Sequence, residues 1–199
     1  DTNLTDEERH KAEVIVKQSK RMQNLINDLN LASKLEYNMQ PINPAKQNLI
    51  AIVRQVVVDF INMDIEDKYP IEWQTDEVLT VCPVNADKDL LKRAVSNLIQ
   101  NSINHNENGC IISVRLEING NNLELVISDN GKGISEKELQ KIQSTPHYLQ
   151  STDNRLDLRH GLGLLLVKEI ISIHKGTVSI SSALNKGFST TISLPINNQ

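Results

Sequence analysis

The sequence of 199 residues contains few aromatic side chains: one Trp, three Tyr and two Phe, or 3% of the chain. Hydrophobic residues make up 39%, so aliphatic side chains must fill the core of any folded domain. Neither sign of charge dominates, because the formal net charge is only −4 and no block of like charge stands out. The composition therefore gives no support to a nucleic-acid-binding or anionic-membrane surface.

Cysteines and long apolar runs are also scarce. Cys82 and Cys110 lie outside any metal-ligand spacing, and we expect free core thiols of a protein in a reducing compartment. No apolar run approaches the roughly 18 residues of a membrane span, and the start DTNLTDEER does not resemble a signal peptide. These absences predict a soluble, cytoplasmic chain with one domain of ordinary size and an appendage.

The first segment predicts one long helix over residues 5–37. Its start, TDEE, is a capping box with Thr5 as N-cap and Glu8 three residues later. Apolar residues recur at seven-residue spacing along it, at Ile15, Met22 and Leu29. Leu25, Ile26 and Ala32 fill the flanking positions of this coiled-coil-like seam. A helix of about 33 residues is about 50 Å long, which exceeds the edge of a small domain. We expect it to pack against a helix outside these 199 residues or in a second chain; the alternative is a solvated helix that folds back on its own domain.

In the rest of the sequence, segments whose apolar residues recur with a helical period alternate with segments that have the two-residue period of a strand. Residues 38–47, with two prolines, are predicted to be a linker. Predicted helices cover 48–61, 87–105, a segment capped by Ser135 and Glu138, and 161–176, closed by Gly176 as C-cap. Predicted strands are 69–75, 78–84, a hairpin of 110–120 and 121–129 with its turn at Asn119-Gly120, 177–184 and 187–196. The polar residues 144–160 are predicted to form a long loop. This order predicts a two-layer α+β sandwich.

Four polar residues share one stripe of the helix predicted over 87–105: Arg93, Asn97, Asn101 and Asn104. Asparagine is a poor helix former, and solvated helix faces more often carry Glu, Lys and Arg. Neutral oxygen donors at this spacing suit Mg²⁺, which prefers oxygen ligands and keeps waters and phosphates in its shell. From the stripe alone, a solvated face and a metal site remain equally open.

A second motif, SDNGKGI, follows directly on a predicted strand. Asp129 would project its carboxylate from the strand end, while Gly131 and Gly133 permit backbone conformations or close approaches that side chains would block. An ordinary Asp-Asn-Gly turn is the alternative. A third motif, RHGLGLLLVK, places Gly161 and Gly163 at a predicted helix start, where free N–H groups and the helix dipole favour phosphate. It matches neither a Rossmann fingerprint nor a P-loop.

The order of these motifs resembles the ATP-binding domain of sensor histidine kinases, within the gyrase, heat-shock chaperone and mismatch-repair ATPase superfamily of the Bergerat fold. NLIQNSINH is similar to the N box, DNGKGI to the first glycine box and GLGL to the second. GFSTTISLP is similar to the closing strand, with Ser189 at the usual threonine position. RMQNLINDLNLASKLE resembles the end of the second helix of the dimerisation and phosphotransfer domain. The resemblance implies that residues 1–40 are part of that domain and that 41–199 form the catalytic domain.

The resemblance also implies residue roles. Asn101 would hold the Mg²⁺ that bridges the ATP phosphates, with Asn97 assisting, and Asp129 would accept the adenine amino group. Residues 135–160 would form a mobile lid. The nucleotide site as a whole would comprise Asn97, Asn101, Asn104, His105, Asp129, Gly131, Gly133, Ile134, Arg159, His160, Gly161, Leu162, Gly163, Leu164 and Ser189.

The sequence departs from the family pattern in three places, one of which is the lid, where KIQSTPHYLQS lacks the phenylalanine-containing motif. Asn104 replaces the usual basic residue, so Arg159 or His160 would have to supply charge to the phosphates. No segment similar to His-Glu-Leu-Arg-Thr-Pro is present, and His10 lies in the wrong context to be the phosphate acceptor. We therefore expect no catalytic residue within these 199 residues and no autophosphorylation by them.

The implied function is the ATP-binding part of a membrane-anchored sensor histidine kinase. Such a kinase passes the γ-phosphate of MgATP to a histidine on another helix for relay to a response regulator, and it forms a homodimer through its phosphotransfer helices. The alternatives are a gyrase- or chaperone-type ATPase and a degenerate nucleotide-binding module. Those ATPases carry a glutamate at the position of Asn97, and an amide cannot act as their general base.

Overall fold

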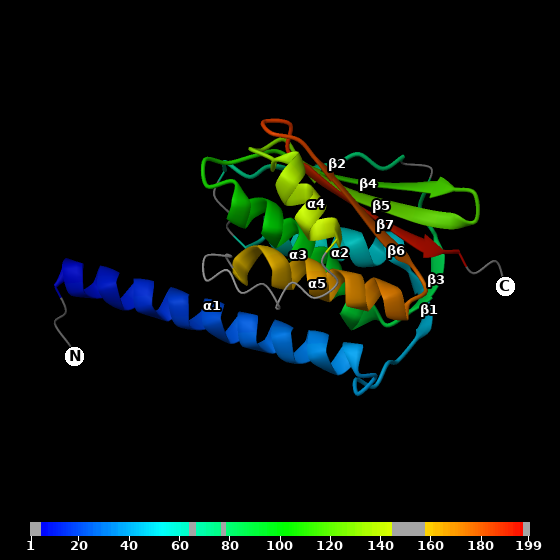
Figure 1. The fold of residues 1–199 in the computed structure, drawn as a ribbon, viewed down its shortest axis with the longest axis horizontal. Coiled ribbons are helices and arrows are strands. Elements are labelled where there is room, and N and C mark those ends of the chain that lie inside the picture. The colour runs from blue at the N-terminus through cyan, green and yellow to red at the C-terminus, as the bar shows by residue number, and fades with distance from the viewer. Residues whose placement is uncertain (1–4, 64–66, 77–78, 145–157, 197–199) are drawn as a thin grey trace.

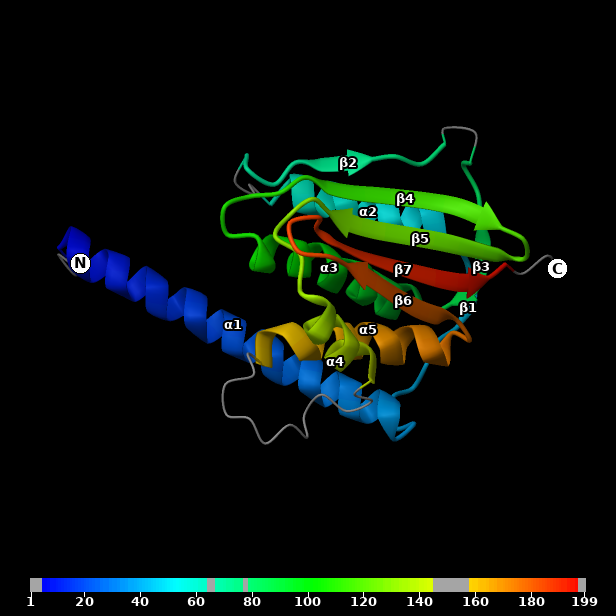
Figure 2. The same cartoon turned by 45° about the horizontal axis from the view of Figure 1, so that its top comes forward.

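The computed structural model describes residues 5–63, 67–76, 79–144 and 158–196. A five-stranded sheet forms one layer, and α2, α3 and α5 form the second layer on one of its faces (Figures 1 and 2). The long helix α1 lies against α5, and its N-terminal part projects beyond the domain (Figure 1). The predicted α+β sandwich preceded by one long helix is therefore confirmed.

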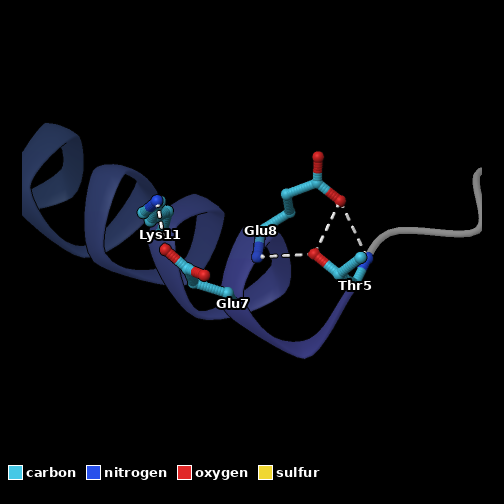
Figure 3. Close-up of polar contacts among 4 residues, drawn as sticks. All are labelled: Thr5, Glu7, Glu8 and Lys11. Carbon is cyan, nitrogen blue, oxygen red and sulfur yellow. Dashed lines mark hydrogen bonds and ion pairs between the residues drawn. The ribbon is translucent and has the colours of Figure 1, made fainter.

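Helix α1 (Asp6–Glu36) begins with the predicted capping box. The hydroxyl of Thr5 accepts a hydrogen bond from the N–H of Glu8, and the carboxylate of Glu8 accepts from the N–H of Thr5 at 2.9 Å (Figure 3). One turn further, Lys11 and Glu7 form an exposed ion pair. These contacts satisfy N–H groups that have no partner within the helix, and they fix where it starts.

The C-terminal part of α1 docks on its own domain. Ala32 and Leu35 are buried, and Asp28 forms an ion pair with Arg93 of α3 (Lys88–His105). The expectation that α1 packs only outside the chain is therefore wrong for this part, where a heptad-like stripe of Leu25, Asp28, Ala32 and Leu35 faces the domain. Of the predicted seam, Leu25 and Ala32 thus face the domain, whereas Ile15, Met22 and Leu29 are 65%, 63% and 40% exposed. A partner for this exposed seam stays a prediction.

The linker region contains a strand that the sequence did not predict. Strand β1 (Ala45–Asn48) pairs antiparallel with β3 (Pro83–Ala86), so the predicted linker 38–47 is too long and the strand predicted at 78–84 is shifted. Asn48 also caps α2 (Leu49–Ile61): its Oδ1 accepts from the N–H groups of Ile50 and Cys82. The linker is thereby held to the domain at its C-terminal end.

The main sheet has the strand order β2-β4-β5-β7-β6. Its members are β2 (Ile71–Trp73), β4 (Ile112–Asn119), β5 (Asn122–Asp129), β6 (Thr177–Ser182) and β7 (Phe188–Pro195). Strand β2 is parallel to β4, and the other neighbours are antiparallel. In the predicted hairpin, Asn119 pairs with Asn122, so the turn residues are Gly120 and Asn121, one position later than expected. Gly120 has a φ of +59°, which suits glycine.

The core lies between the sheet and the three helices. Alternate residues of β4, β5 and β7 point inward, including Val114, Leu125 and Ile192. They meet the aliphatic faces of α2, α3 and α5 (Leu158–Ile173), and every fully buried large side chain of the described residues is Leu or Ile. The expected aliphatic core is thus observed.

The end of α5 is fixed differently from the prediction. Lys175, with a φ of +60°, is the left-handed residue after the helix, whereas Gly176 is needed for space because a Cβ there would lie 2.6 Å from the carbonyl oxygen of Ser193. Nearby, the buried ring of His174 accepts a hydrogen bond from the N–H of Asp87, the N-cap of α3, at 2.9 Å. This contact ties the end of α5 to the start of α3.

Candidate functional site

A cavity opens between α3, the loop after β5, β7 and α5. It has a volume of about 700 Å³ including its open mouth. Its walls are formed by Leu98, Asn101, Ser102, His105, Asn106, Ile127, Asp129, Lys132, Gly133, Ile134, Ile142, Leu164, Phe188 and Thr190. Such a concave, mainly apolar pocket with a few polar groups is typical of a small-molecule site.

Asp129 supplies the carboxylate of the cavity. It is the last residue of β5, paired with β4 on one side and β7 on the other, so its backbone is fixed in the middle of the sheet. One carboxylate oxygen accepts a hydrogen bond from the N–H of Gly131 at 3.0 Å. The second carboxylate oxygen forms no hydrogen bond with the described residues, and it can accept one from a ligand.

The loop after Asp129 is held by Asn106, at the C-terminal end of α3. Its Nδ2 donates to the carbonyl of Ser102 at 2.8 Å, and its Oδ1 accepts from the N–H of Lys132 at 3.0 Å. A Cβ at position 131 would lie 1.8 Å from that same Oδ1, so the buried Asn106 requires Gly131. Gly133 has a φ of +59° and lies against the carbonyl of Ala183. Both glycines therefore have a steric reason in the free protein.

The four side chains of the polar stripe on α3 have different surroundings in the structure. Arg93 is held by Asp28 of α1, and Asn104 is exposed, accepts a hydrogen bond from Gln100 and does not line the cavity. Asn101 does line it and lies against α5, where a Cβ at Gly163 would be 3.1 Å from its Oδ1. Asn97 lies one turn earlier. The stripe is therefore not one continuous ligand set.

Asn97 has an unusual environment. Its Nδ2 is buried and has no hydrogen-bond partner among the described residues. Such an unpaired buried amide is rare because it has lost its hydrogen bonds to water. Because this Nδ2 forms no hydrogen bond with the described residues, the amide can turn its oxygen towards a hydrated cation. Asn97 and Asn101 therefore fit the oxygen-only preference of Mg²⁺, although only Asn101 lines the cavity. No group of three or more His, Cys, Asp and Glu in the described part of the chain could hold a metal alone, so phosphates and waters would complete the shell.

The second glycine motif differs from its prediction. Helix α5 begins at Leu158, so Gly161 and Gly163 lie within the helix and not at its start. Gly161 is the fourth residue of the helix, at the end of its first turn. The N–H of Gly163 lies beyond that turn, so Gly163 does not offer the free N–H group that was expected of it. Leu164 lines the cavity, whereas Leu162 is buried but does not line it. The side chains of Arg159 and His160 and the loop 145–157 lie outside what the structure describes, so the predicted phosphate cations and lid stay predictions.

On the closing strand, the residue expected at the site does not line the cavity. On β7, Phe188 and Thr190 line the cavity, while Ser189 lies among the residues of the opposite, open face of the sheet. Sequence reasoning also gave no role to Asn106, Lys132 and Ile142. The signal for Thr190 was present: it is in phase with the apolar residues Ile192 and Leu194, and alternate residues of a strand share a face.

Two ionisable groups, the thiol of Cys110 and the ammonium group of Lys168, have shifted pKa values. Burial, reinforced by the negative charge of Asp129, raises the pKa of the Cys110 thiol to about 11. Burial also lowers the pKa of Lys168, on α5. Cys110 and Cys82 are free and buried as expected, and within the described residues no helix is long and apolar enough to cross a membrane.

Comparisons with known proteins identify the family. Residues 86–198 match the family described as histidine kinase-, DNA gyrase B-, and HSP90-like ATPase, and the chain belongs to this family. The sensor histidine kinase YvrG of Bacillus subtilis (strain 168) is 30% identical over 188 residues, which cover 94% of this chain and 32% of YvrG. The chain thus spans about a third of that relative. The ATP-binding catalytic domain is of the histidine kinase type, and nothing found favours the gyrase or chaperone alternative.

Solved structures show the same fold. Full-length ShkA in complex with AMPPNP has a TM-score of 0.74 at 21% identity, over 98% of this chain and 40% of that one. The histidine kinase ThkA in complex with the response regulator TrrA has a TM-score of 0.70 at 23% identity, over 98% of this chain and 53% of that one.

Proposed function

We propose that the cavity binds MgATP and presents its γ-phosphate to a histidine of a phosphotransfer helix. The observation that carries this proposal is that Asp129 and Asn101, from two different elements, line one cavity. A carboxylate that can still accept a hydrogen bond recognises the amino group of adenine, and an amide oxygen serves a hydrated cation on phosphates. Phosphoryl transfer depends mainly on positioning and charge neutralisation, and both groups serve these ends.

The adenine end is formed by Asp129 together with Thr190, which takes the position first given to Ser189. Thr190 is only 2% exposed and provides the second polar side chain at this end. Apolar side chains from α3, β5 and the following loop complete the walls around it: Leu98, Ile127 and Ile134. The fixed backbone at Gly131 and Gly133 lets the loop approach the base closely.

At the phosphate end, Asn101 would ligate Mg²⁺ with Asn97 assisting. When bound, this ion neutralises charge on the phosphates, which is its usual contribution in phosphoryl transfer. Gly163 leaves room for Asn101, since a larger residue would press on its amide. His105 lines the cavity and completes this wall, whereas the exposed Asn104 supplies no charge. Arg159, His160 and Gly161 remain candidates for phosphate contacts.

The reaction that we propose is transfer to a histidine, not hydrolysis. An amide at Asn97 cannot take a proton from water at ordinary pH, so a nucleophile must be delivered to the nucleotide. His10 is exposed on α1 without the acceptor sequence around it, so we expect these 199 residues to bind ATP without phosphorylating themselves. The kinase relatives support this choice over an ATPase and over a degenerate module.

We further propose that residues 1–40 belong to a dimerisation and phosphotransfer domain and that 41–199 are the catalytic domain. The exposed seam of Ile15, Met22 and Leu29 supports a homodimer through this helix, because such a stripe is rarely left in water. A response regulator is the proposed recipient of the phosphate, as the complex of the similar kinase ThkA suggests. The proposed place of action is the cytoplasmic side of a membrane-anchored kinase.

The test is a calorimetric titration with ATP and GTP, each with and without Mg²⁺. The expected result is tighter binding of MgATP than of MgGTP, because the keto oxygen of guanine would face the carboxylate of Asp129. Equal binding of both, or binding of neither, would contradict the proposal. Labelled ATP with the purified chain then checks that no acid-labile, alkali-stable phosphate forms on it.

A further inference from the structure

Lys168 is a half-buried cation that the proposed site does not use. It lies in the middle of α5, and its Nζ donates a hydrogen bond to the carbonyl oxygen of Ile142 at 3.2 Å. No carboxylate of the described residues pairs with it. Burying an ammonium group without a counter-ion is costly, so the site requires a compensating contact.

That contact is the negative end of α4 (Glu136–Ser144). The last carbonyl groups of a helix have no partner within it and carry a partial negative charge, which a cation stabilises. A second side chain acts at the same end, since Gln143 donates to the carbonyl of Ile180 on β6 at 3.2 Å. Ser135 and Glu138 cap the other end of the helix. Lys168 therefore joins the C-terminal end of α4 to α5.

Two residues at or beside this contact, Ile142 and Leu164, line the cavity. Ile142 packs against the core and lines the cavity with its side chain. Leu164, one turn before Lys168 on the same face of α5, lines the cavity as well. The hydrogen bond thus fixes the spacing of two wall residues that come from different helices.

We propose that Lys168 is a positioning residue for nucleotide binding, which acts by holding the Ile142 wall of the cavity against α5. This inference rests on the proposed function, since it assumes that the cavity receives ATP. Lys168 does not contact the nucleotide in this scheme. It sets the position of Ile142, and the tightness of the apolar wall follows from that position.

The experiment compares Lys168→Met, which keeps the length of the side chain and removes its charge, with Lys168→Arg, which keeps a charged donor. The matched control is Lys137→Met, which removes an exposed lysine from α4, the helix whose C-terminal end Lys168 contacts. Loss of a helix-terminal cation contact should weaken MgATP binding about three- to tenfold in Lys168→Met, with Lys168→Arg and the control close to the unmodified chain. Hydrogen exchange in the last turn of α4 should be faster in nucleotide-free Lys168→Met.

A double-mutant cycle separates positioning from general destabilisation. If Lys168 acts through Ile142, the affinity lost in Lys168→Met should largely disappear in an Ile142→Ala background, because the wall is already absent. Additive losses, or unchanged affinity in Lys168→Met while the unmodified chain binds MgATP, would overturn this inference and leave the proposed function standing. Failure of the unmodified chain to bind MgATP would remove both.

Discussion

Replacing Asp129 by asparagine tests the adenine end of the cavity with a near-isosteric change. In the structure, one oxygen of Asp129 accepts from the N–H of Gly131 at 3.0 Å, and an asparagine can keep this bond through its own oxygen. The loop should therefore hold its conformation. The other carboxylate oxygen becomes an NH₂ group, so a donor meets the donor of the adenine amino group.

The magnitude follows from the hydrogen bond that is lost. A hydrogen bond to a charged group contributes about 1.5–3 kcal/mol, or about one to two factors of ten in ATP affinity. GTP should lose less or gain, because guanine presents an oxygen where adenine presents its amino group. Calorimetric titration of Asp129→Asn with both nucleotides measures the two changes, and Glu107→Gln, an exposed carboxylate beside the mouth that does not line the cavity, is the matched control.

Cys110 provides an independent probe in the same variant. Because the charge of Asp129 contributes to the raised pKa of Cys110, its removal should lower that pKa and speed thiol alkylation at mildly alkaline pH in the folded protein. Faster alkylation shows that the charge beside the thiol has gone. If alkylation is faster and yet ATP affinity falls no further than in Glu107→Gln, Asp129 does not recognise adenine.

Three further predictions concern other parts of the molecule. Asn101→Ala should weaken MgATP by about 1.5–3 kcal/mol while leaving metal-free ATP nearly unchanged in calorimetry, and equal losses would show that it is no metal ligand. Arg93→Ala should cost about 1 kcal/mol of unfolding free energy, as expected for a partly exposed ion pair, and should speed hydrogen exchange in the C-terminal part of α1; unaltered exchange would contradict the docking contact. Because the pKa of Cys110 is raised from 9.0 to about 11, the folded chain keeps a proton that the unfolded chain releases in this range. Unfolding free energy should therefore fall as the pH rises from about 9 to about 11, and denaturant titration of Cys110→Ala should show a smaller fall.

Local patterns predicted most of the fold, whereas the roles expected for the site residues came from the family resemblance. The hydrophobic period of α3, the alternation of β4 and β5 and both capping boxes depend on residues close in sequence, and each is observed. Asp129 is the last residue of a strand whose end the alternation already marked. These elements could be predicted because short-range sterics and hydrogen bonds determine them.

Two of the errors involve contacts between distant segments. Strand β1 has the polar sequence AKQN, and only its pairing with β3 makes it a strand. The docking of α1 combines the stripe of Leu25, Ala32 and Leu35 with the ion pair of Asp28 and Arg93, and the period of a stripe does not tell which surface it meets. At the closing strand, the alternation places Thr190 on the cavity side, whereas the role expected for Ser189 came from the family resemblance. Tertiary contacts and register determine such features, and a single sequence contains them only implicitly.

The attachment of the linker has a mechanical consequence for α1. Asp87 accepts a hydrogen bond from the N–H of Asn43 at 3.0 Å with one carboxylate oxygen and caps α3 with the other. The chain is thus anchored from Asn43 onward, and any rotation of α1 relative to the domain must occur between its C-cap, Tyr37, and Ile42. A helix of 31 residues extends about 46 Å from this pivot, so a rotation of about 10° moves its far end by about 8 Å. Once its docking contacts through Asp28, Ala32 and Leu35 were released, helix α1 would therefore move as a lever arm about these few residues, and small rotations there would be amplified at its distant end.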